Sequence, residues 1–427
     1  MEIQRLPGFR DFYPDDYAWR EYIFSGWRET AKQFAFQEYD GPMLESTDLY
    51  RKKSGEELKT QLYRFVDQGN RDVCLRPEMT PTLARLVAAR ERDFKKPIKW
   101  FSVASFFRSE KPQKGRLREF SQVNCDILGE SSPAADAELI ALAIQMLRRF
   151  GLTPEDFYVR LNDRRLWRRF LDSKGVAEDQ LTEVLAIVDK IERESEVETQ
   201  AKLKQFGLSL EEIRAFLSQP VANVSDFEPL LRELRWRGLQ DFVEVDLTVV
   251  RGLDYYTGFV FEIFDRQRES RSLAGGGRYD QLISTISDGA VDLAAAGFGM
   301  GDVTVQDLLA SLPQTRARAE SAFAARYLQV YVAIADEDHR PEAIGLITRL
   351  REQNLWVDFA LQPSKLGKQF QLAEAAHARF AVVVGREWPE VKVKTLSDRS
   401  ETVVPVDELQ SFLTNAMRGQ ERVARSE

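Results

Sequence analysis

Cysteine and histidine are the rarest residues in this 427-residue chain, which has two of each. Cys74 and Cys125 lie far apart and form no CxxC pair, so they give no signal for a metal-binding cluster. Two cysteines fit a reducing compartment, and one disulfide between them is the alternative. Both histidines, His339 and His377, lie in the last quarter of the chain. Residues 1–338 therefore cannot form a histidine-dependent catalytic triad or a zinc site with histidine ligands.

Long apolar runs are also missing from the sequence. No stretch approaches the roughly 18 apolar residues of a membrane-spanning helix. The first residues, MEIQRLPGFRDFYPDD, carry acids and no apolar run, unlike a signal peptide. These features predict a cytoplasmic protein with no membrane partner.

Positive charge is not in excess either, because the formal net charge is -8. A basic footprint over the whole protein is therefore absent, and any RNA contact has to use local patches. Hydrophobic residues make up 43% and charged residues 30%, as in an ordinary globular protein. The length predicts two or three domains.

The pattern of hydrophobic residues changes along the chain. Residues 17–39 and 134–151 have the spacing of amphipathic helices, and residues 96–108 and 119–129 predict a hairpin with a long tip. Helical spacing fills the segment from 166 to 236, which resembles a small insertion. Strand signals return from residue 242, with short loops that favour antiparallel pairing. After 325, strands and helices alternate, which predicts a compact α/β domain with a mostly parallel sheet.

The first candidate site is FFRSEKPQKGRLREFSQ, residues 106–122, a basic loop between two strands. Guanidinium groups bind phosphate in a bidentate manner, and a flexible basic loop suits an RNA backbone. Phe120 returns to a strand and offers a ring face to a base. A solvated hairpin tip is the alternative. The loop's cations are Arg108, Lys111, Lys114, Arg116 and Arg118, partly offset by Glu110 and Glu119.

The second candidate is VVRGLDYYTGFVFEIF, residues 249–264. It places Arg251, Asp254 and two tyrosines in an otherwise apolar strand region. An unpaired buried arginine costs several kcal/mol, so the pattern favours a polar pocket for an anionic ligand. The alternative is a structural Arg251–Asp254 ion pair, with the tyrosines filling the core.

Four weaker signals follow. The glycines of 273–282 let the backbone approach another group closely or form a bulge, and the segment does not match a dinucleotide fingerprint. The alternating glycines of 294–302 suit a strand against which a flat ligand lies, with tight strand–helix packing as the alternative. Glu78 precedes a predicted helix, where it would either receive an ammonium group or act as a first-turn acid favoured by the helix dipole. The arginine-rich segment 160–170 is typical of a solvated helix face.

Together these segments resemble the histidyl-tRNA synthetases, a class II aminoacyl-tRNA synthetase family, over nearly the whole chain. FRSEKPQKGRLREFSQ resembles the second class II motif, and RGLDYYTGFVFEIF and AGGGRYDQL resemble the two histidine-specific motifs. RGLDYY followed by GGRYD is the most specific of these signals. The resemblance implies an α+β fold, with an antiparallel six-stranded sheet flanked by helices, a helical insertion and a C-terminal α/β anticodon-binding domain. The implied parts are a catalytic core in two pieces (1–165 and 237–312), the insertion (166–236), a linker (313–325) and the anticodon-binding domain (326–427).

The resemblance also implies the reaction. Histidine and ATP, with Mg²⁺ on the phosphates and no metal held by the protein alone, would give histidyl-adenylate, and the histidyl group would pass to tRNA(His). The enzyme would be a homodimer, with the segment ending at Pro42 at the interface. Pyrophosphate displacement needs positioning and fixed positive charge more than a proton-transfer residue, so the scarcity of histidine is no objection.

Site residues are carried over by motif. Arg108 and Arg251 would be the catalytic cations on the α-phosphate. Glu110 would contact the adenine region, and Phe120 would stack on the base. The histidine-binding set would be Glu78, Thr80 and Gln122 at the α-amino group, and Asp126, Tyr255, Tyr256 and Tyr279 around the imidazole. The tRNA contacts would be Lys111, Lys114, Arg116 and Arg118.

Two positions depart from the family pattern. The third class II motif usually ends in an acid–arginine pair whose arginine packs on the adenine ring, and here Thr304 stands in that place, with Asp302 nearby. Asp126 replaces the more common glutamate, which shortens the reach to the imidazole.

Two alternative functions remain open. The first is a non-catalytic paralogue, such as the regulatory subunit of ATP phosphoribosyltransferase, and the second is an amino-acid-sensing domain.

Overall fold

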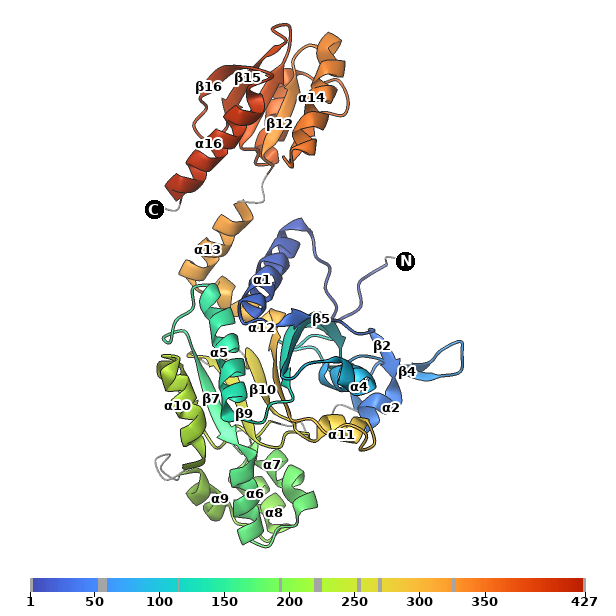
Figure 1. The fold of residues 1–427 in the computed structure, drawn as a ribbon, viewed down its shortest axis with the longest axis vertical. Helices are drawn as coiled ribbons and strands as arrows, with labels where there is room; N and C mark the ends of the chain where they lie inside the picture. Colours follow the sequence, from blue (N-terminus) through green and yellow to red (C-terminus); the bar gives the residue numbers. More distant parts are fainter. Residues whose placement is uncertain are drawn as a thin grey trace. The chain divides into compact units, whose positions relative to one another are not determined.

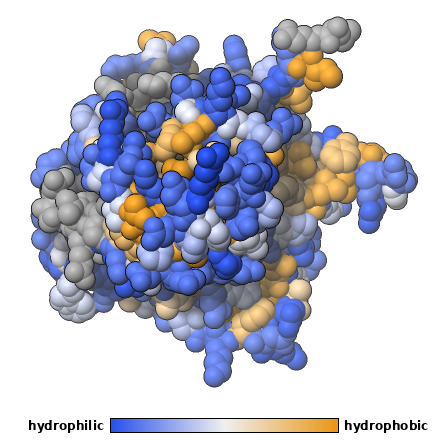
Figure 2. Space-filling view, turned by 90° about the horizontal axis from the view of Figure 1, so that it is seen from above, coloured by the Kyte–Doolittle hydropathy of each residue, from blue (hydrophilic) through white to orange (hydrophobic). Residues whose placement is uncertain are grey.

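The computed structural model describes residues 3–52, 60–113, 115–191, 194–218, 225–251, 255–267, 271–324 and 328–424. It divides into two compact units, Met1–Ala319 and Glu320–Glu427 (Figure 1). Within the described ranges, no helix is long and apolar enough to cross a membrane. On the face shown in Figure 2, hydrophilic residues cover most of the surface, and hydrophobic residues are exposed in small groups.

An eight-stranded sheet forms the centre of the first unit, in the order β1-β5-β6-β11-β10-β9-β7-β8. The six inner strands pair antiparallel, as predicted, whereas the short strands β1 and β8 add parallel edges. The strands are β1 (Gln37–Glu38), β5 (Ile98–Phe107), β6 (Glu119–Leu128), β7 (Phe157–Asp163), β8 (Val243–Val245), β9 (Phe259–Asp265), β10 (Ala274–Arg278) and β11 (Ala295–Gly301).

The two faces of this sheet have different roles. Successive side chains of a strand point to opposite faces. Cys125 and Ile127 of β6 are buried in the larger hydrophobic core, to which helices α1 (Pro14–Gln33) and α5 (Pro133–Arg149) contribute. Asp126, between them, points to the other face. The apolar face therefore anchors the sheet, and the opposite face is left for polar side chains.

Shorter elements border that second face. Helix α4 (Thr80–Arg90) and helix α11 (Leu282–Ile286) pack together and share a second hydrophobic cluster. A three-stranded sheet precedes α4 in the chain, with helix α2 (Thr47–Arg51) beside it. Its strands are β2 (Leu44–Ser46), β3 (Arg64–Val66) and β4 (Asp72–Leu75).

Helices occupy the described parts of the predicted insertion. In Figure 1, α6, α7, α8 and α9 gather into one group, and α10 lies beside α5, which it contacts. The chain then returns to the sheet through β8. These helices are α6 (Arg164–Ser173), α7 (Leu181–Val188), α8 (Glu196–Lys204), α9 (Leu210–Leu217) and α10 (Glu228–Trp236). Helix α12 (Asp302–Ser311) follows β11, and helix α13 (Pro313–Ala324) occupies the segment predicted as a linker.

The second unit contains a five-stranded sheet in the order β13-β12-β14-β15-β16. Three strands pair parallel, and β15 and β16 add an antiparallel hairpin. The prediction of a mostly parallel sheet is therefore wrong, because half of the pairings are antiparallel. The strands are β12 (Val330–Ile334), β13 (Val357–Phe359), β14 (Phe380–Val384), β15 (Glu390–Thr395) and β16 (Glu401–Pro405), and the helices are α14 (Arg340–Glu352), α15 (Leu366–Ala375) and α16 (Leu409–Ala424).

Candidate active site

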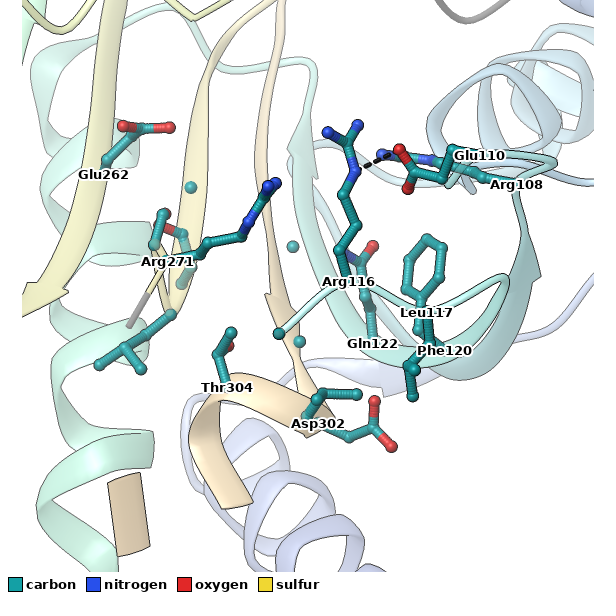
Figure 3. Close-up of a pocket in the computed structure, with 18 of the residues that line it drawn as sticks. Arg108, Glu110, Arg116, Leu117, Phe120, Gln122, Glu262, Arg271, Asp302 and Thr304 are labelled. Carbon is teal, nitrogen blue, oxygen red and sulfur yellow. Dashed lines mark hydrogen bonds and ion pairs between the residues drawn. The ribbon is translucent and has the colours of Figure 1, made fainter. Parts of the chain in front are cut away.

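A cavity of about 250 Å³ opens on the polar face of the large sheet (Figure 3). Four segments that are distant in the sequence contribute to its lining. They are the β5–β6 loop with the start of β6, the residue Arg251, the strands β9 and β10 with the segment before β10, and the junction of β11 with α12. The cavity therefore depends on the tertiary fold of the first unit.

Arg108 occupies one side of this cavity, directly after β5. Its guanidinium carbon lies 5.1 Å from the centre of the Phe120 ring, and its Nε donates to the carbonyl of Pro77 at 3.1 Å. Desolvation lowers the pKa of Arg108, and the nearby Glu78 and Glu110 carboxylates act in the opposite direction. The stacking and the carbonyl contact hold the guanidinium in a fixed orientation at the cavity wall.

Arg251 lines the same cavity beside β9 and β10. Its Nη1 donates to Glu262 Oε1 at 2.9 Å, and its backbone has a left-handed φ of 47°. The sequence offered Asp254 as a structural partner of Arg251, but Asp254 lies outside the described residues. A Cβ added at Gly275 would lie 1.4 Å from Arg251 Nη1, so only glycine at this position leaves room for the guanidinium.

The charges around the cavity favour an anionic ligand. Four guanidinium groups line it, from Arg108, Arg116, Arg251 and Arg271. Three carboxylates also line it, and each forms an ion pair. Glu110 pairs with Arg116, and Glu262 pairs with Arg251. Asp302 pairs at 2.6 Å with Arg10, which is not part of the lining. The lining thus carries more positive than negative groups, and a concave site of this kind concentrates anions.

A buried cluster of tyrosines and carboxylates lies on the same face. The hydroxyl of Tyr279 donates to Asp126 Oδ1 at 2.5 Å, and the hydroxyl of Tyr255 donates to Glu78 Oε2 at 2.8 Å. The Tyr255 ring lies 5.9 Å from the Tyr279 ring and 5.1 Å from the Tyr256 ring. Five of the side chains carried over to the histidine pocket, those of Glu78, Asp126, Tyr255, Tyr256 and Tyr279, therefore form one connected cluster.

Burial raises the pKa of two groups in this cluster, Asp126 and Tyr255. Burial raises the pKa of the Asp126 carboxyl from 3.8 to about 7, although the hydrogen bond from Tyr279 lowers it. Burial also raises the pKa of Tyr255, and the Glu78 charge adds to that increase. A carboxyl group that titrates near neutrality beside hydroxyl groups suits an imidazole, which also titrates near neutrality.

Strand β6 joins this cluster to the cavity. Gln122 and Asp126 point to the same face, about 13 Å apart at the rise of an extended strand, and Gln122 lines the cavity. A Cβ at Gly297, opposite Asp126 on β11, would lie 1.9 Å from Asp126 Oδ1. Thr80 is the first residue of α4, shortly after Glu78. The predicted histidine-binding residues therefore border one region between α4 and the sheet.

The basic loop differs in part from a solvated tip. Lys111 is exposed, whereas Lys114 lies outside the described residues. Arg116 lines the cavity and pairs with Glu110. Arg118 donates from Nε to the carbonyl of Glu110 at 3.0 Å and from Nη1 to the carbonyl of Pro7 at 3.3 Å. Arg118 therefore ties the N-terminal segment to the loop.

Sequence reasoning missed one buried arginine next to the site. Arg164, the first residue of α6, donates to the carbonyls of Val250 at 3.0 Å, Arg251 at 2.6 Å and Tyr256 at 3.2 Å. It thereby holds both ends of the segment that carries Arg251 and Tyr256. The expectation that this segment forms a solvated helix face is wrong for Arg164. The signal in the sequence was that Arg164 directly follows Asp163, the residue that caps the start of α6.

The third-motif segment closes the cavity at the start of α12. Asp302 accepts from the backbone N–H of Ser121 at 3.0 Å and from Arg10 Nη2 at 2.6 Å. Thr304 is buried and lines the cavity. Asp302 therefore has a structural role, linking the N-terminal segment, β6 and α12.

Comparisons with known proteins agree along the chain. A family model described as "Histidyl-tRNA synthetase" matches residues 8–302, and one described as "Anticodon binding domain" matches residues 329–416. A "Histidine--tRNA ligase" of Opitutus terrae is 43% identical over 96% of this chain and 98% of its own length. Another, of Leptospira biflexa, is 37% identical over 93% of each chain.

Solved structures share the fold. The histidyl-tRNA synthetase from Nostoc sp. has a TM-score of 0.77 at 21% identity, over 97% of this chain and 100% of that one. A Bacillus halodurans protein described as "an ATP phosphoribosyltransferase regulatory subunit/histidyl-tRNA synthetase" has a TM-score of 0.72 at 22% identity, over 90% of this chain and 98% of that one. Because the synthetase model spans more than half of the sequence and the relatives align along nearly all of it, this chain belongs to the histidyl-tRNA synthetase family.

Proposed function

We propose that this protein is a histidine–tRNA ligase, which activates histidine with ATP and transfers it to tRNA(His). One observation carries the proposal. Arg108 and Arg251, which are 143 positions apart in the numbering, line a single cavity next to a buried tyrosine–carboxylate cluster. This is the arrangement that a site for an acyl phosphate intermediate requires, with fixed cations at the phosphate and a shaped polar pocket for the amino acid.

The activation step needs no proton transfer to the protein. An oxygen of the histidine carboxylate attacks the α-phosphorus of ATP, the bond from that phosphorus to the bridging oxygen breaks, and its electron pair leaves with pyrophosphate. Negative charge is spread over the α-phosphate oxygens in the transition state. We assign Arg108 and Arg251 to those oxygens, because both guanidinium groups are held in place by protein contacts before the ligand arrives.

Mg²⁺ would enter with the nucleotide. Among the described residues, no group of three or more His, Cys, Asp or Glu side chains could hold a metal ion. Glu262 lines the cavity and offers carboxylate oxygens of the kind that Mg²⁺ prefers, which fits an ion bound chiefly by phosphates. Bound Mg²⁺ would neutralise charge on the β- and γ-phosphates.

Recognition of the base and the amino acid follows from the two regions. Phe120 would stack on adenine, and Glu110 would contact its edge. The histidine ammonium group would lie near Glu78, Thr80 and Gln122. This assignment is supported by the burial of Glu78 and by its hydrogen bond from Tyr255.

The imidazole would lie among Asp126, Tyr255, Tyr256 and Tyr279. The hydroxyl of Tyr279 already contacts Asp126, so it can extend the reach of a carboxylate shorter than the family's usual glutamate. An amino acid without ring nitrogens would leave these buried polar groups unpaired, which can reject it by several orders of magnitude.

The nucleic-acid contacts, the assembly and the compartment are parts of the same proposal. Lys111, Lys114, Arg116 and Arg118 would reach the tRNA acceptor end, and the 326–427 domain would bind the anticodon. The core would comprise 1–165 and 237–312, with 166–236 as the insertion. A homodimer in the cytoplasm, with the segment ending at Pro42 at its interface, completes the proposal, and the two free cysteines fit that compartment.

Histidine-dependent exchange of pyrophosphate into ATP tests the activation step. The wild-type protein should catalyse exchange only when histidine is present, and it should then charge tRNA(His). Arg251→Ala should lose most of the exchange rate with little change in histidine affinity. Wild-type exchange no higher than that of Arg251→Ala would reject the ligase. Absence of charging together with co-purification of a phosphoribosyltransferase would instead support the regulatory subunit.

A further inference from the structure

Arg271 enters the cavity from a segment that no sequence motif singled out. It lies between β9 and β10, and its side chain points into the cavity from the side opposite Phe120 (Figure 3). Its Nη2 donates to Gln113 Oε1 at 2.6 Å, across 158 positions of sequence. This contact links the segment before β10 to the basic loop that follows β5.

Small residues surround the stem of Arg271. A Cβ added at Gly115 would lie 3.4 Å from Thr304 Cγ2 and 3.9 Å from Arg271 Cδ, so the three residues meet at one point of the wall. Gly115 and Thr304 contribute little side-chain volume there. The guanidinium of Arg271 is therefore the large polar group at the end of the cavity where Thr304 stands.

The chemistry of the two walls matches a flat aromatic ligand. Phe120 presents a ring on one side, and Arg271 presents a planar guanidinium on the other. A guanidinium group stacks on aromatic faces, whereas an ammonium group has no plane with which to do so. A purine base between the two walls would be sandwiched by a ring and a cation.

Building on the ligase function proposed above, we propose that Arg271 packs against the adenine ring of ATP opposite Phe120. It supplies from the segment before β10 the cation that the third motif lacks at Thr304. The small side chain of Thr304 and the absence of a Cβ at Gly115 leave space for this side chain. Arg271 is thus an ATP-binding residue, and it takes no part in holding histidine.

Exchange kinetics of Arg271→Ala test the proposal, with the KM values for ATP and histidine measured separately. Loss of one cation–aromatic contact should raise the KM for ATP by about 3- to 30-fold, with the histidine KM within about twofold of the wild-type value. Arg271→Lys should recover only part of the loss, because it keeps the charge and loses the plane. Arg271→Ala combined with Thr304→Arg should regain part of the ATP affinity.

Gln113→Ala is the matched control. It removes the 2.6 Å hydrogen bond and keeps the guanidinium, so its KM for ATP should stay within about twofold of the wild-type value. An equal effect of Gln113→Ala and Arg271→Ala would show that Arg271 merely anchors the loop, and would overturn the proposal. An unchanged KM for ATP in Arg271→Ala, or an equal rise in both KM values, would overturn it as well.

Calorimetric titration of ATP into the wild-type protein and Arg271→Ala separates this inference from the proposed activity. Weaker ATP binding by the variant supports the role of Arg271 whether or not exchange is observed. Equal ATP affinity refutes that role even in an active ligase. An inactive wild-type protein would count against the ligase function alone.

Discussion

Gly275→Ala tests directly whether the position of Arg251 governs catalysis. An added Cβ would lie 1.4 Å from Arg251 Nη1 and 2.4 Å from its Cζ, whereas ordinary contacts are 3.4–4 Å. The guanidinium group therefore has to move by about 2 Å. The atoms that overlap are at the end of a flexible side chain, so the strand itself need not shift.

The expected cost in stability is small. Moving the guanidinium breaks its 2.9 Å pair with Glu262, in which the side chains are 19% and 25% exposed. Pairs accessible to solvent contribute about 0–1 kcal/mol, so the melting temperature should fall by no more than about 4 °C. The catalytic cost is large, because a displacement of about 1 Å can reduce a rate on the order of 100-fold.

Pyrophosphate exchange and thermal unfolding together check this prediction. Gly275→Ala should lose at least about 100-fold in exchange rate, and it should add little to Arg251→Ala in the double variant, because both changes remove the same contact. Gly345→Ala is the control, since its added Cβ would meet no atom of the described residues within 4 Å. A Gly275→Ala protein with a near-normal rate would show that Arg251 tolerates displacement and would refute the reasoning.

Three further predictions concern the proposed histidine pocket and its surroundings. Arg164→Ala leaves buried carbonyls unpaired, which should destabilise the protein by about 1–3 kcal/mol and raise the histidine KM in exchange assays. Arg168→Ala, on the same helix, should do neither, because its pair with Glu178 is exposed on both sides. Asp126 keeps its proton in the folded state up to about pH 7 but releases it near 3.8 when unfolded, so stability should decrease as pH rises between those values. Urea unfolding should show this slope in the ligand-free wild-type protein and a flatter one in Asp126→Asn. The histidine KM of the wild type should fall from pH 6 to 8, as the carboxylate becomes free to accept from the imidazole, with the ATP KM nearly constant.

Local patterns predicted the part of the site that lies on regular strands. Strand-like residues at 96–108 and 119–129, with a loop-like segment between them, predicted the hairpin. The structure pairs Ile98 with Leu128 through to Phe107 with Glu119. Arg108 and Phe120 lie at the ends of those strands, so their side-by-side placement followed from the hairpin. The approach of Arg251 could be expected only from the resemblance, because no local pattern specifies which distant strand pairs with which.

Features that depend on tertiary pairing were missed. The edge strand β1 has two residues, too few to show a period of two. The strand signal from residue 242 covers β8, but the parallel pairing of β8 with β7 was not predicted. The β16 strand was not predicted, and its pairing with β15 changes the second sheet from mostly parallel to mixed. Arg164 and Arg165 are adjacent in an arginine-rich segment, but only Arg164 is buried. Its guanidinium donates to the carbonyls of Val250, Arg251 and Tyr256. Composition cannot distinguish such neighbours.

The polar face of the sheet gains its space from glycines in the neighbouring strands β10 and β11. Gly275 of β10 pairs with Gly299 of β11, and Gly297 pairs with Asp126 across the next ladder. A side chain at Gly275 would take the place of the Arg251 guanidinium, and one at Gly297 would take the place of the Asp126 carboxylate. The glycines therefore position Arg251 and Asp126, the groups proposed to hold the phosphate and the imidazole, on the same sheet face. The Arg251 guanidinium and the Asp126 carboxylate both lie over paired backbone, so the distance between them is set by the spacing of the strands. A reaction between a bound amino acid and a bound nucleotide requires such a fixed distance.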